Sequence, residues 1–381
     1  MTVTPPVSPD QNLELRWAET EDDKASAYRL RYDLYVTDQG LFQDVADHDR
    51  RWLTDAYDDV SRIALAEIDG EVVGTARLTF GGEATFSEAT RREYDLDRFA
   101  GVVGDADLCI LARFLVRKEY RGNGMLSFQL LWTAFECAAV HGLELLLGSC
   151  EPHLLNRYRT LGCQPYGKLY NHPTSGALVP IAVVLGDLAH VRRIRSPMVS
   201  ALARRTRPHD QVDHILPLIK SREPAIRSRG HDEERHWNAI FAGLSRGKAS
   251  LRGILRELSH EEASLLMAKS HIIDCRPGDA IILTGHVSRT LYVLLQGSLE
   301  VHDGGRTVAT VEDSGALVGE VAFFTGGRRM SDVLAGPGGA RVLALSAGNL
   351  QEIIHRHSPM AAKFLHYVAC GLCEKLLERA R

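Results

Sequence analysis

Residues 317–333 read LVGEVAFFTGGRRMSDV, the most specific run in the chain. A small turn at Gly319 is followed by one acid, Glu320, and Arg329 stands nine positions after that acid on a glycine-rich loop. Exposed backbone N–H groups at the start of a short helix receive anions, and an arginine pairs with phosphate oxygens. A carboxylate accepts a hydrogen bond from a ribose hydroxyl. The run therefore predicts a site for a nucleotide with a cyclic phosphate.

The sequence on both sides of this run predicts a β-roll. From Cys275 onward, short apolar stretches are separated by glycine turns, and strands at such close spacing are typical of a small barrel or roll. Residues 350–377 then have helical spacing, with one break near Pro359. The expected strands are 280–284, 290–295, 299–302, 307–311, 333–334 and 341–345.

Residues 258–377 resemble a cyclic nucleotide-binding domain of the kind found in bacterial transcription regulators and cyclic-nucleotide-dependent kinases. Besides the 317–333 run, the resemblance includes a preceding helix that we expect to end near Ile273. The other matching residues are Arg276-Pro277-Gly278-Asp279, Gly285, Leu291-Tyr292-Val293 and Gly297.

The resemblance implies a role for each polar residue of the run. Glu320 would bind the ribose 2′-hydroxyl, and Arg329 would bind the phosphate. Met330 follows the arginine where some cyclic GMP binders have threonine, so cyclic AMP is the expected ligand, ahead of cyclic GMP. The alternative is a roll that has lost its ligand and serves as an interaction module. Further residues expected at the site are Gly319, Val321 and Ala322, and Arg328 departs from the proline of many members.

The first half of the chain predicts a mixed sheet with helices. Residues 61–68 and 71–80 are strands joined by Asp69-Gly70, a strong hairpin signal. Thr20 is suited to cap a helix over residues 21–35. The other expected elements are strands 107–116, 143–150 and 179–185 and helices 125–141 and 154–161. A hairpin, a strand, a crossover helix and a further strand indicate an α+β fold with a mixed α/β layer.

A glycine loop lies between the strand that holds Arg113 and the helix that begins at Met125. The loop reads Arg121-Gly122-Asn123-Gly124, and backbone amides at such a helix start can cradle a pyrophosphate. An ordinary strand-to-helix turn is the alternative interpretation.

Residues 13–197 resemble the GNAT acyltransferase superfamily, and within it the branch of acyl-homoserine lactone synthases and long-chain N-acyl amino acid synthases. The matching residues are Arg31, the acids Asp55, Asp58 and Asp59, the run 74–78, Arg113, the loop 121–125 and the run 154–162. The resemblance implies a mixed α/β GNAT fold and transfer of an acyl group from acyl-coenzyme A or acyl-carrier protein to an amine. The residues assigned to the acyl donor are Arg113, Arg121, Gly122, Asn123, Gly124 and Met125, and Leu126 departs from the family loop.

One expected catalytic residue is replaced. In the synthase branch a glutamate often lies three residues before the strand arginine, and this chain has Ile110 there. An attacking amine must lose a proton. Asp58 is therefore a candidate base, with Asp107, Glu144, a water or an amine already deprotonated in solution as substitutes. Tyr158 is either the general acid for the leaving thiol or a packing residue. An inactive domain is a further alternative.

The charged residues of this half have two interpretations each. Asp55, Asp58 and Asp59 form either a solvated acidic turn or an acceptor-binding cluster. Arg77 and Arg113 are expected to be structural or to bind donor phosphate, and not to be catalysts. The histidines and cysteines show no spacing that implies a metal site.

The composition excludes several classes of protein. The 381 residues carry 45 Lys and Arg against 49 Asp and Glu, a net charge of −4, and no DNA-reading motif is visible, so we expect no DNA partner. Seven cysteines at irregular spacings do not form a disulfide framework, which favours a reducing, cytoplasmic location. No apolar run reaches the ~18 residues that a membrane span needs.

The predicted organisation has four parts: a disordered tail over 1–12, a GNAT-like acyltransferase domain over 13–197, a basic helical connector over 198–257 and a cyclic nucleotide-binding domain over 258–381. Between residues 192 and 229 ten basic residues face three acids. This excess indicates either a solvated linker or a docking surface for an acidic partner or a domain interface.

Together these features predict an N-acyltransferase that is regulated allosterically by a cyclic nucleotide. One alternative is a cyclic AMP-regulated protein-lysine acyltransferase, and another is a non-catalytic cyclic nucleotide sensor with a degenerate GNAT domain. The expected acceptor is a small-molecule or protein amine. Acyl-carrier protein is a candidate partner, and a homodimer formed through helices of the nucleotide domain is a further expectation.

Overall fold

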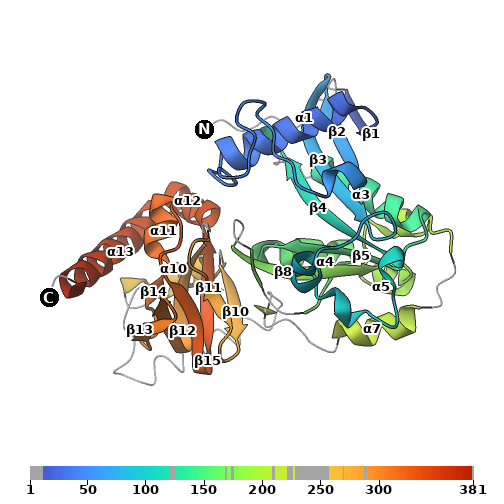
Figure 1. The fold of residues 1–381 in the computed structure, drawn as a ribbon. Coiled ribbons are helices and arrows are strands. Elements are labelled where there is room, and N and C mark those ends of the chain that lie inside the picture. The colour runs from blue at the N-terminus through green and yellow to red at the C-terminus, as the bar shows by residue number, and fades with distance from the viewer. Residues whose placement is uncertain are drawn as a thin grey trace. The chain divides into compact units, whose positions relative to one another are not determined.

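Two sheets organise the chain, and each lies mainly in one of two units (Figure 1). The first unit is formed mainly by residues up to 223, and the second mainly by the residues that follow. The computed structural model describes residues 12–120, 125–167, 170–172, 176–207, 211–220, 226–227, 257–268, 270–286 and 290–379.

The first sheet is mixed, with the strand order β1-β2-β3-β4-β5-β8-β6, and β7 pairs with β8. Its neighbouring strands run antiparallel except β4 and β5, which are parallel. This arrangement confirms the mixed α/β layer, and the predicted hairpin turns at Asp69-Gly70. The strands are β1 Leu13–Trp17, β2 Arg62–Ile68, β3 Glu71–Phe80, β4 Leu108–Val116, β5 Leu145–Cys150, β6 Gln164–Pro165, β7 Tyr170–His172 and β8 Gly176–Val184.

Helices cover both faces of this sheet. α1 (Glu21–Arg31) packs against Ile63 of β2, whereas α3 (Met125–Val140) packs against Ala64 of the same strand. Successive strand residues point to opposite faces, so the two helices lie on opposite sides. A Cβ atom at Gly74 would lie 2.8 Å from a Leu130 methyl of α3, so glycine lets this helix approach the sheet.

The expected helix over residues 21–35 is α-helical only to Arg31. Its start is as predicted, because the Thr20 side chain accepts a hydrogen bond from the Asp23 N–H and the Asp23 carboxylate accepts one from the Thr20 N–H. A π-helical segment, Tyr32–Thr37, follows. The other helices of the unit are α2 Glu88–Glu93, α4 Leu155–Leu161, α5 Leu188–Arg193, α6 Val199–Leu202 and α7 Val212–Lys220, with 3₁₀ turns at Asp58–Val60, Leu96–Arg98, Asp105–Asp107, Lys118–Tyr120 and Pro152–Leu154.

Part of the expected connector packs on the first unit. α6 and α7 belong to that unit, and apolar residues of α7 are buried in its core. Arg205 precedes α7, and its side chain, which is 1% exposed, donates to the Glu144 carboxylate at 2.5 Å. Arg205 thus pairs with an acid of the unit instead of facing solvent, whereas Arg204 and Arg207 pair with acids and remain exposed. Residues 221–256, apart from 226–227, lie outside the described part of the chain.

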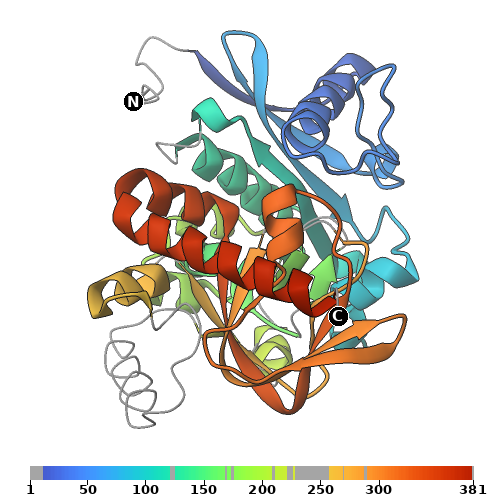
Figure 2. The same cartoon turned by 90° about the vertical axis from the view of Figure 1, so that its left-hand side faces the viewer.

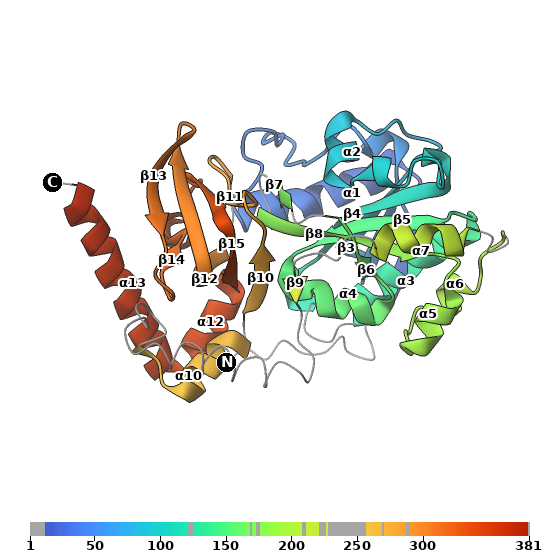
Figure 3. The same ribbon diagram turned by 90° about the horizontal axis from the view of Figure 1, so that it is seen from below.

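The second sheet is antiparallel, with the order β13-β12-β15-β10-β9, while β11 pairs with β15 and β14 with β12 (Figure 3). Two strands are longer than expected. The expected strands 290–295 and 299–302 form one continuous strand, and so do the expected strands 333–334 and 341–345. β12 spans 290–303 and β15 spans 332–346, with register shifts near Gly297. The strands are β9 Ile226–Arg227, β10 His271–Cys275, β11 Ala280–Ile282, β12 Thr290–Asp303, β13 Arg306–Val311, β14 Leu317–Val318 and β15 Asp332–Ser346.

Four helices complete the described part of the second unit: α10 His260–Ala268, α11 Glu320–Thr325, α12 Ala347–Arg356 and α13 Ser358–Arg379 (Figure 2). The helix expected to end near Ile273 ends at Ala268, because residues 271–275 pair with β15 as strand β10. The break near Pro359 is confirmed, since α12 ends at Arg356 and α13 begins at Ser358. Apolar residues of α10, α12 and α13 share one core with β12 and β15.

Within the described ranges, no helix combines the length and apolar character required to cross a bilayer. The seven cysteines are present as free thiols, five of them at least partly buried. No group of three His, Cys, Asp or Glu side chains suited to a metal ion occurs among the residues that the structure describes.

Candidate functional sites

The two parallel strands at the centre of the first sheet diverge. Pairing between β4 and β5 is limited to three residue pairs, from Leu108 with Leu145 to Ile110 with Leu147. β4 nevertheless continues to Val116 and β5 to Cys150. The ladder between the described residues of these strands therefore ends at Ile110, and the β4 edge beyond it keeps backbone polar groups that β5 does not pair.

Arg113 lies at a bulge in this diverging part of β4. Thr75 of β3 faces Leu115, but Arg77 faces Ala112, so β4 has one more residue than β3 between the two pairs. Arg113 has a φ of 52°, a left-handed conformation that is uncommon for a residue with a side chain. Its guanidinium donates from Nη2 and Nε to Asp55 Oδ2 at 2.7 and 3.1 Å. Because Asp55 occupies the guanidinium, this geometry favours a structural role for Arg113 over donor-phosphate binding.

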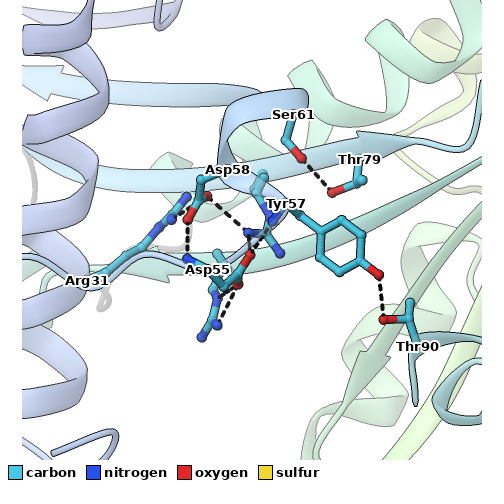
Figure 4. A network of polar contacts seen from close by, with 9 residues as sticks. Arg31, Asp55, Tyr57, Asp58, Ser61, Thr79 and Thr90 are labelled. Carbon is cyan, nitrogen blue, oxygen red and sulfur yellow. Dashed lines mark hydrogen bonds and ion pairs between the residues drawn. The ribbon is translucent and has the colours of Figure 1, made fainter. Parts of the chain in front are cut away.

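Asp58 is the centre of a buried ionic network (Figure 4). Its Oδ1 accepts hydrogen bonds from Arg31 Nη1 at 2.7 Å and from Arg77 Nη1 at 3.0 Å. Its Oδ2 accepts one from the Asp55 N–H at 2.8 Å. Asp58 is 2% exposed and Arg31 is 0% exposed. Since both carboxylate oxygens already accept from donors, the geometry favours a structural role for Asp58 over that of a general base.

The acidic group at residues 55–59 is therefore not a solvated turn. Asp55 accepts from both Arg77 and Arg113, Asp58 accepts from Arg31 and Arg77, and only Asp59 is exposed. The network holds three guanidinium groups against two carboxylates. Sequence reasoning identified all five side chains but did not pair them.

The Asp55 carboxyl is strongly acidic in the folded protein. Burial by itself raises its pKa, but the guanidiniums of Arg77 and Arg113 outweigh burial and hold the pKa well below its usual range. A carboxylate whose folded-state pKa is lowered stabilises the fold at every pH above its unfolded-state pKa, roughly 4. This stabilisation is lost as the pH falls through the lowered folded-state value.

We therefore expect the difference in unfolding free energy between wild type and Asp55→Asn to be constant from about pH 7 to about pH 5 and to shrink steadily below about pH 4. Urea unfolding of both proteins across this range measures the difference. A difference at pH 3 equal to that at pH 7 would show that Asp55 is not held ionised by its arginines.

Tyr158 of α4 meets one requirement for a general acid. Burial raises its pKa well above the ordinary value, and the neighbouring Cys150 and Cys163 raise it further. The phenol is protonated at neutral pH, as an ordinary phenol also is, and the rise in its pKa makes it a weaker acid toward a leaving thiolate. Tyr35 contributes to the raised pKa of both Tyr158 and Arg113.

The substitute bases Asp107 and Glu144 lie at the other end of the diverging strands. Asp107 immediately precedes β4 and pairs with Arg207 at 3.0 Å, and Glu144 immediately precedes β5. From Asp107 to Arg113 the chain advances six residues, about 20 Å along a strand. Neither acid is therefore placed to act at the bulge, and Ile110 is a buried apolar residue.

The expected donor loop, Arg121-Gly122-Asn123-Gly124, lies outside the described residues. Met125 is the first residue of α3, and its side chain is exposed. The donor assignment of this loop therefore stays a prediction.

In the second unit, Arg329 lies beside the start of α11, the helix that begins at Glu320. Glu320 and Arg329 are both buried, at 7% and 4% exposed. Burial lowers the pKa of Arg329, while the charge of Glu320 acts in the opposite direction. Arg329 donates from Nη1 to the Gly319 carbonyl and from Nη2 to the Thr290 carbonyl, each at 2.5 Å. Its backbone N–H donates to the His286 carbonyl at 2.8 Å, which fixes the loop on which it stands.

The remaining expected nucleotide residues differ in exposure. Ala322 is buried in α11, whereas Val321 and Met330 expose their apolar side chains. Gly319 precedes α11 with a φ of 85°, a conformation that favours glycine. A Cβ atom there would lie 2.3 Å from Arg329 Nη1 and 2.9 Å from Ile282 Cδ1.

Gly319→Ala is therefore expected to displace Arg329 and to weaken cyclic nucleotide binding by about 10-fold or more. Gly348→Ala in α12 is the matched control, because no atom lies within 4 Å of the added methyl group, and its affinity is expected to equal that of wild type. Calorimetric titration measures both affinities. Equal affinities for the two variants would contradict the packing argument.

These features define the class of protein: an acyltransferase-like domain joined to a cyclic nucleotide-binding domain. Residues 26–183 match the family model described as N-acyl amino acid synthase FeeM, and residues 272–357 match the cyclic nucleotide-binding domain. The chain thus contains a FeeM-type N-acyl amino acid synthase domain followed by a cyclic nucleotide-binding domain, which confirms both resemblances.

Curated relatives are similar to part of the chain. The cyclic nucleotide-gated channel beta-3 of Canis lupus familiaris is 33% identical over 105 residues, which are 26% of this chain and 13% of the channel. The channel of the same name from Mus musculus is 34% identical over 107 residues, 26% of this chain and 15% of the channel. The chain thus spans less than a sixth of the length of either relative.

Solved structures of both kinds are similar to parts of the chain. The CoA-dependent acyl-homoserine lactone synthase MesI has 23% identity and a TM-score of 0.38, over 48% of this chain and 93% of MesI. The catabolite activator protein of Thermus thermophilus has 26% identity and a TM-score of 0.29, over 33% of this chain and 59% of that protein.

Proposed function

We propose that the first domain transfers an acyl group from a thioester of coenzyme A or acyl-carrier protein to an amine. The observation that carries the proposal is the divergence of β4 and β5 after Ile110, with Arg113 at a bulge in the freed edge. A strand edge of this kind pairs with an extended ligand through main-chain hydrogen bonds. Backbone N–H groups fixed there can also stabilise negative charge on the thioester oxygen in the transition state.

The acceptor in this proposal is a small molecule with a free amine. The family description, N-acyl amino acid synthase, supports an amino acid. Tyr158 is assigned the role of general acid from the resemblance to the superfamily, and its phenol is protonated at neutral pH. With Ile110 in the family's glutamate position and Asp58 occupied by arginines, the amine loses its proton to water or enters deprotonated.

The proposal assigns regulation to the second domain. Glu320 binds the ribose 2′-hydroxyl and Arg329 the phosphate of a cyclic nucleotide, with cyclic AMP preferred over cyclic GMP because Met330 supplies no hydroxyl. Binding is coupled to acyl transfer, and typical coupling energies change an activity by about 5-fold to 150-fold. The free cysteines of the chain favour a reducing compartment such as the cytoplasm as its place of action.

The test is release of free thiol from a panel of short and long acyl thioesters, with single amino acids or a lysine peptide as acceptor. Each reaction is run with and without saturating cyclic AMP. We expect release that requires a thioester and an amino acid, and that changes with the nucleotide. Acylation of the lysine peptide in place of free amino acids would instead support a cyclic AMP-regulated protein-lysine acyltransferase.

A non-catalytic sensor is the second candidate function, and one observation favours it. Ile110 replaces the family's glutamate, and Asp107 and Glu144 lie at the start of β4 and β5, so none of these three positions supplies a base at the bulge. Nucleotide binding without thiol release from any donor would support the sensor and overturn the catalytic proposal.

A further inference from the structure

One edge of the Arg31 guanidinium has no hydrogen-bond acceptor among the residues that the structure describes, although its carbon lies 5.4 Å from the centre of the Tyr28 ring. The Arg31 side chain is 0% exposed, and its Nη1 donates to Asp58 at 2.7 Å. Its Nε and Nη2 find no acceptor there. These two nitrogens lie on the same side of the planar group, so they present parallel N–H bonds to a single acceptor.

Four other arginines of the chain use this same edge to hold a carboxylate oxygen. The N···O distances range from 2.5 to 3.1 Å, and each of the four side chains is more exposed than that of Arg31. The pairs are Arg16 with Glu67, Arg91 with Asp97, Arg98 with Asp95 and Arg113 with Asp55. Arg31 therefore differs from these four, and an unfilled donor pair is most unfavourable at a buried position. Among the described residues, Arg205, whose side chain is 1% exposed, likewise leaves two guanidinium nitrogens, Nε and Nη1, without an acceptor.

The charge around Arg31 also requires an anion. Arg31, Arg77 and Arg113 contribute three positive charges, and Asp55 and Asp58 contribute two negative charges. Burial lowers the pKa of Arg31, the direction expected where positive charge is incompletely compensated. An excess of one buried positive charge is unfavourable unless it is paired.

We propose that the Nε–Nη2 edge of Arg31 binds a small monovalent anion. One negative charge balances the network, and two N–H donors suit a halide or one carboxylate oxygen. A phosphate dianion would overcompensate the charge. The anion is either a free ion, such as chloride or formate, or the carboxylate of the acceptor; only the second source rests on the proposed function.

The test measures thermal unfolding of the full chain in chloride, bromide and formate against gluconate, at constant sodium concentration. A ligand that binds only the folded state raises Tm with its concentration, and we expect a rise of about 5 °C between sub-saturating and saturating chloride. Arg31→Lys keeps a charge for Asp58 but loses the edge, so its rise should vanish. Arg16→Lys is the matched control, because Glu67 already fills the edge of Arg16, and it should retain the rise.

Anomalous diffraction from bromide-soaked crystals of the wild type gives a readout that does not require Arg31→Lys to fold. A bromide peak at Arg31 together with the chloride-dependent Tm supports a free anion. The acceptor carboxylate is supported if neither the bromide peak nor the chloride-dependent Tm occurs, but an added amino acid raises Tm and the corresponding amino acid carboxamide does not. If neither halide nor amino acid stabilises the protein and no peak occurs, the proposal is wrong. None of these readouts requires acyl transfer.

Discussion

Arg329→Ala is expected to abolish micromolar binding of cyclic AMP, with a loss of affinity of about 30-fold to 4,000-fold, equivalent to about 2–5 kcal/mol. The guanidinium is 4% exposed and is oriented by the carbonyl groups of Gly319 and Thr290. In the proposed site it pairs with the cyclic phosphate. Its removal leaves a phosphate charge without a partner in a largely desolvated place, which is why the expected loss is large.

The neighbouring arginine provides the control for this prediction. Arg328 is exposed and donates to the Gly285 carbonyl at 3.1 Å. Arg328→Ala removes a charge of the same sign one residue away, and we expect its affinity to stay within about 3-fold of wild type. Calorimetry measures binding after thermal unfolding has shown that each variant is folded. Similar losses in both variants would indicate a general electrostatic effect and not a specific phosphate contact.

Local signals predicted most elements of the first domain. The Asp69-Gly70 turn fixed the register of β2 and β3, and Thr20 capped α1 as expected. β1 was missed, because Leu13–Trp17 is a short strand whose edge position depends on pairing with β2, far along the chain. The end of α1 was misplaced because the apolar spacing continues through the π-helical segment Tyr32–Thr37.

In the second domain, the sequence predicted the roll but divided its long strands. The glycines between the expected strands suggested turns, yet Gly297 pairs with Ala340, and Gly339 lies within β15 in the irregular stretch between the paired residues Ala335 and Ala340. A Cβ atom at Gly297 would lie 2.2 Å from the Gly339 carbonyl oxygen, so these glycines permit close backbone approach within one ladder. A glycine in a sequence does not tell whether the chain turns or only bulges.

The two candidate sites differ in how far sequence could predict them. Glu320 and Arg329 lie on one continuous run, so spacing alone indicated their joint site. The ionic network joins Arg31, Asp58 and Arg113 from three separate elements. Which of these residues pair cannot be deduced from their spacing in the sequence, because the fold brings them together. Sequence analysis therefore identified the charged residues but did not predict that Asp58 would be buried between two arginines.

Asp58→Asn is expected to destabilise the first domain by about 3–5 kcal/mol, because it removes one carboxylate from a buried network that already carries excess positive charge. The asparagine keeps the shape of the side chain but leaves Arg31 and Arg77 facing a neutral oxygen. Urea unfolding followed by circular dichroism measures the change. Asp59→Asn, at the exposed neighbouring position, is the control and should unfold like wild type.

The same pair of variants separates a structural Asp58 from a catalytic one. If Asp58 acts only through the network, Asp58→Asn should lower the unfolding free energy, and the folded fraction should retain thiol release at low temperature. If Asp58 is the base, thiol release should fall by about 100-fold or more with stability nearly unchanged. The 2% exposure of Asp58 and the donors on both of its oxygens favour the first result, because a base must have a lone pair free to take the proton.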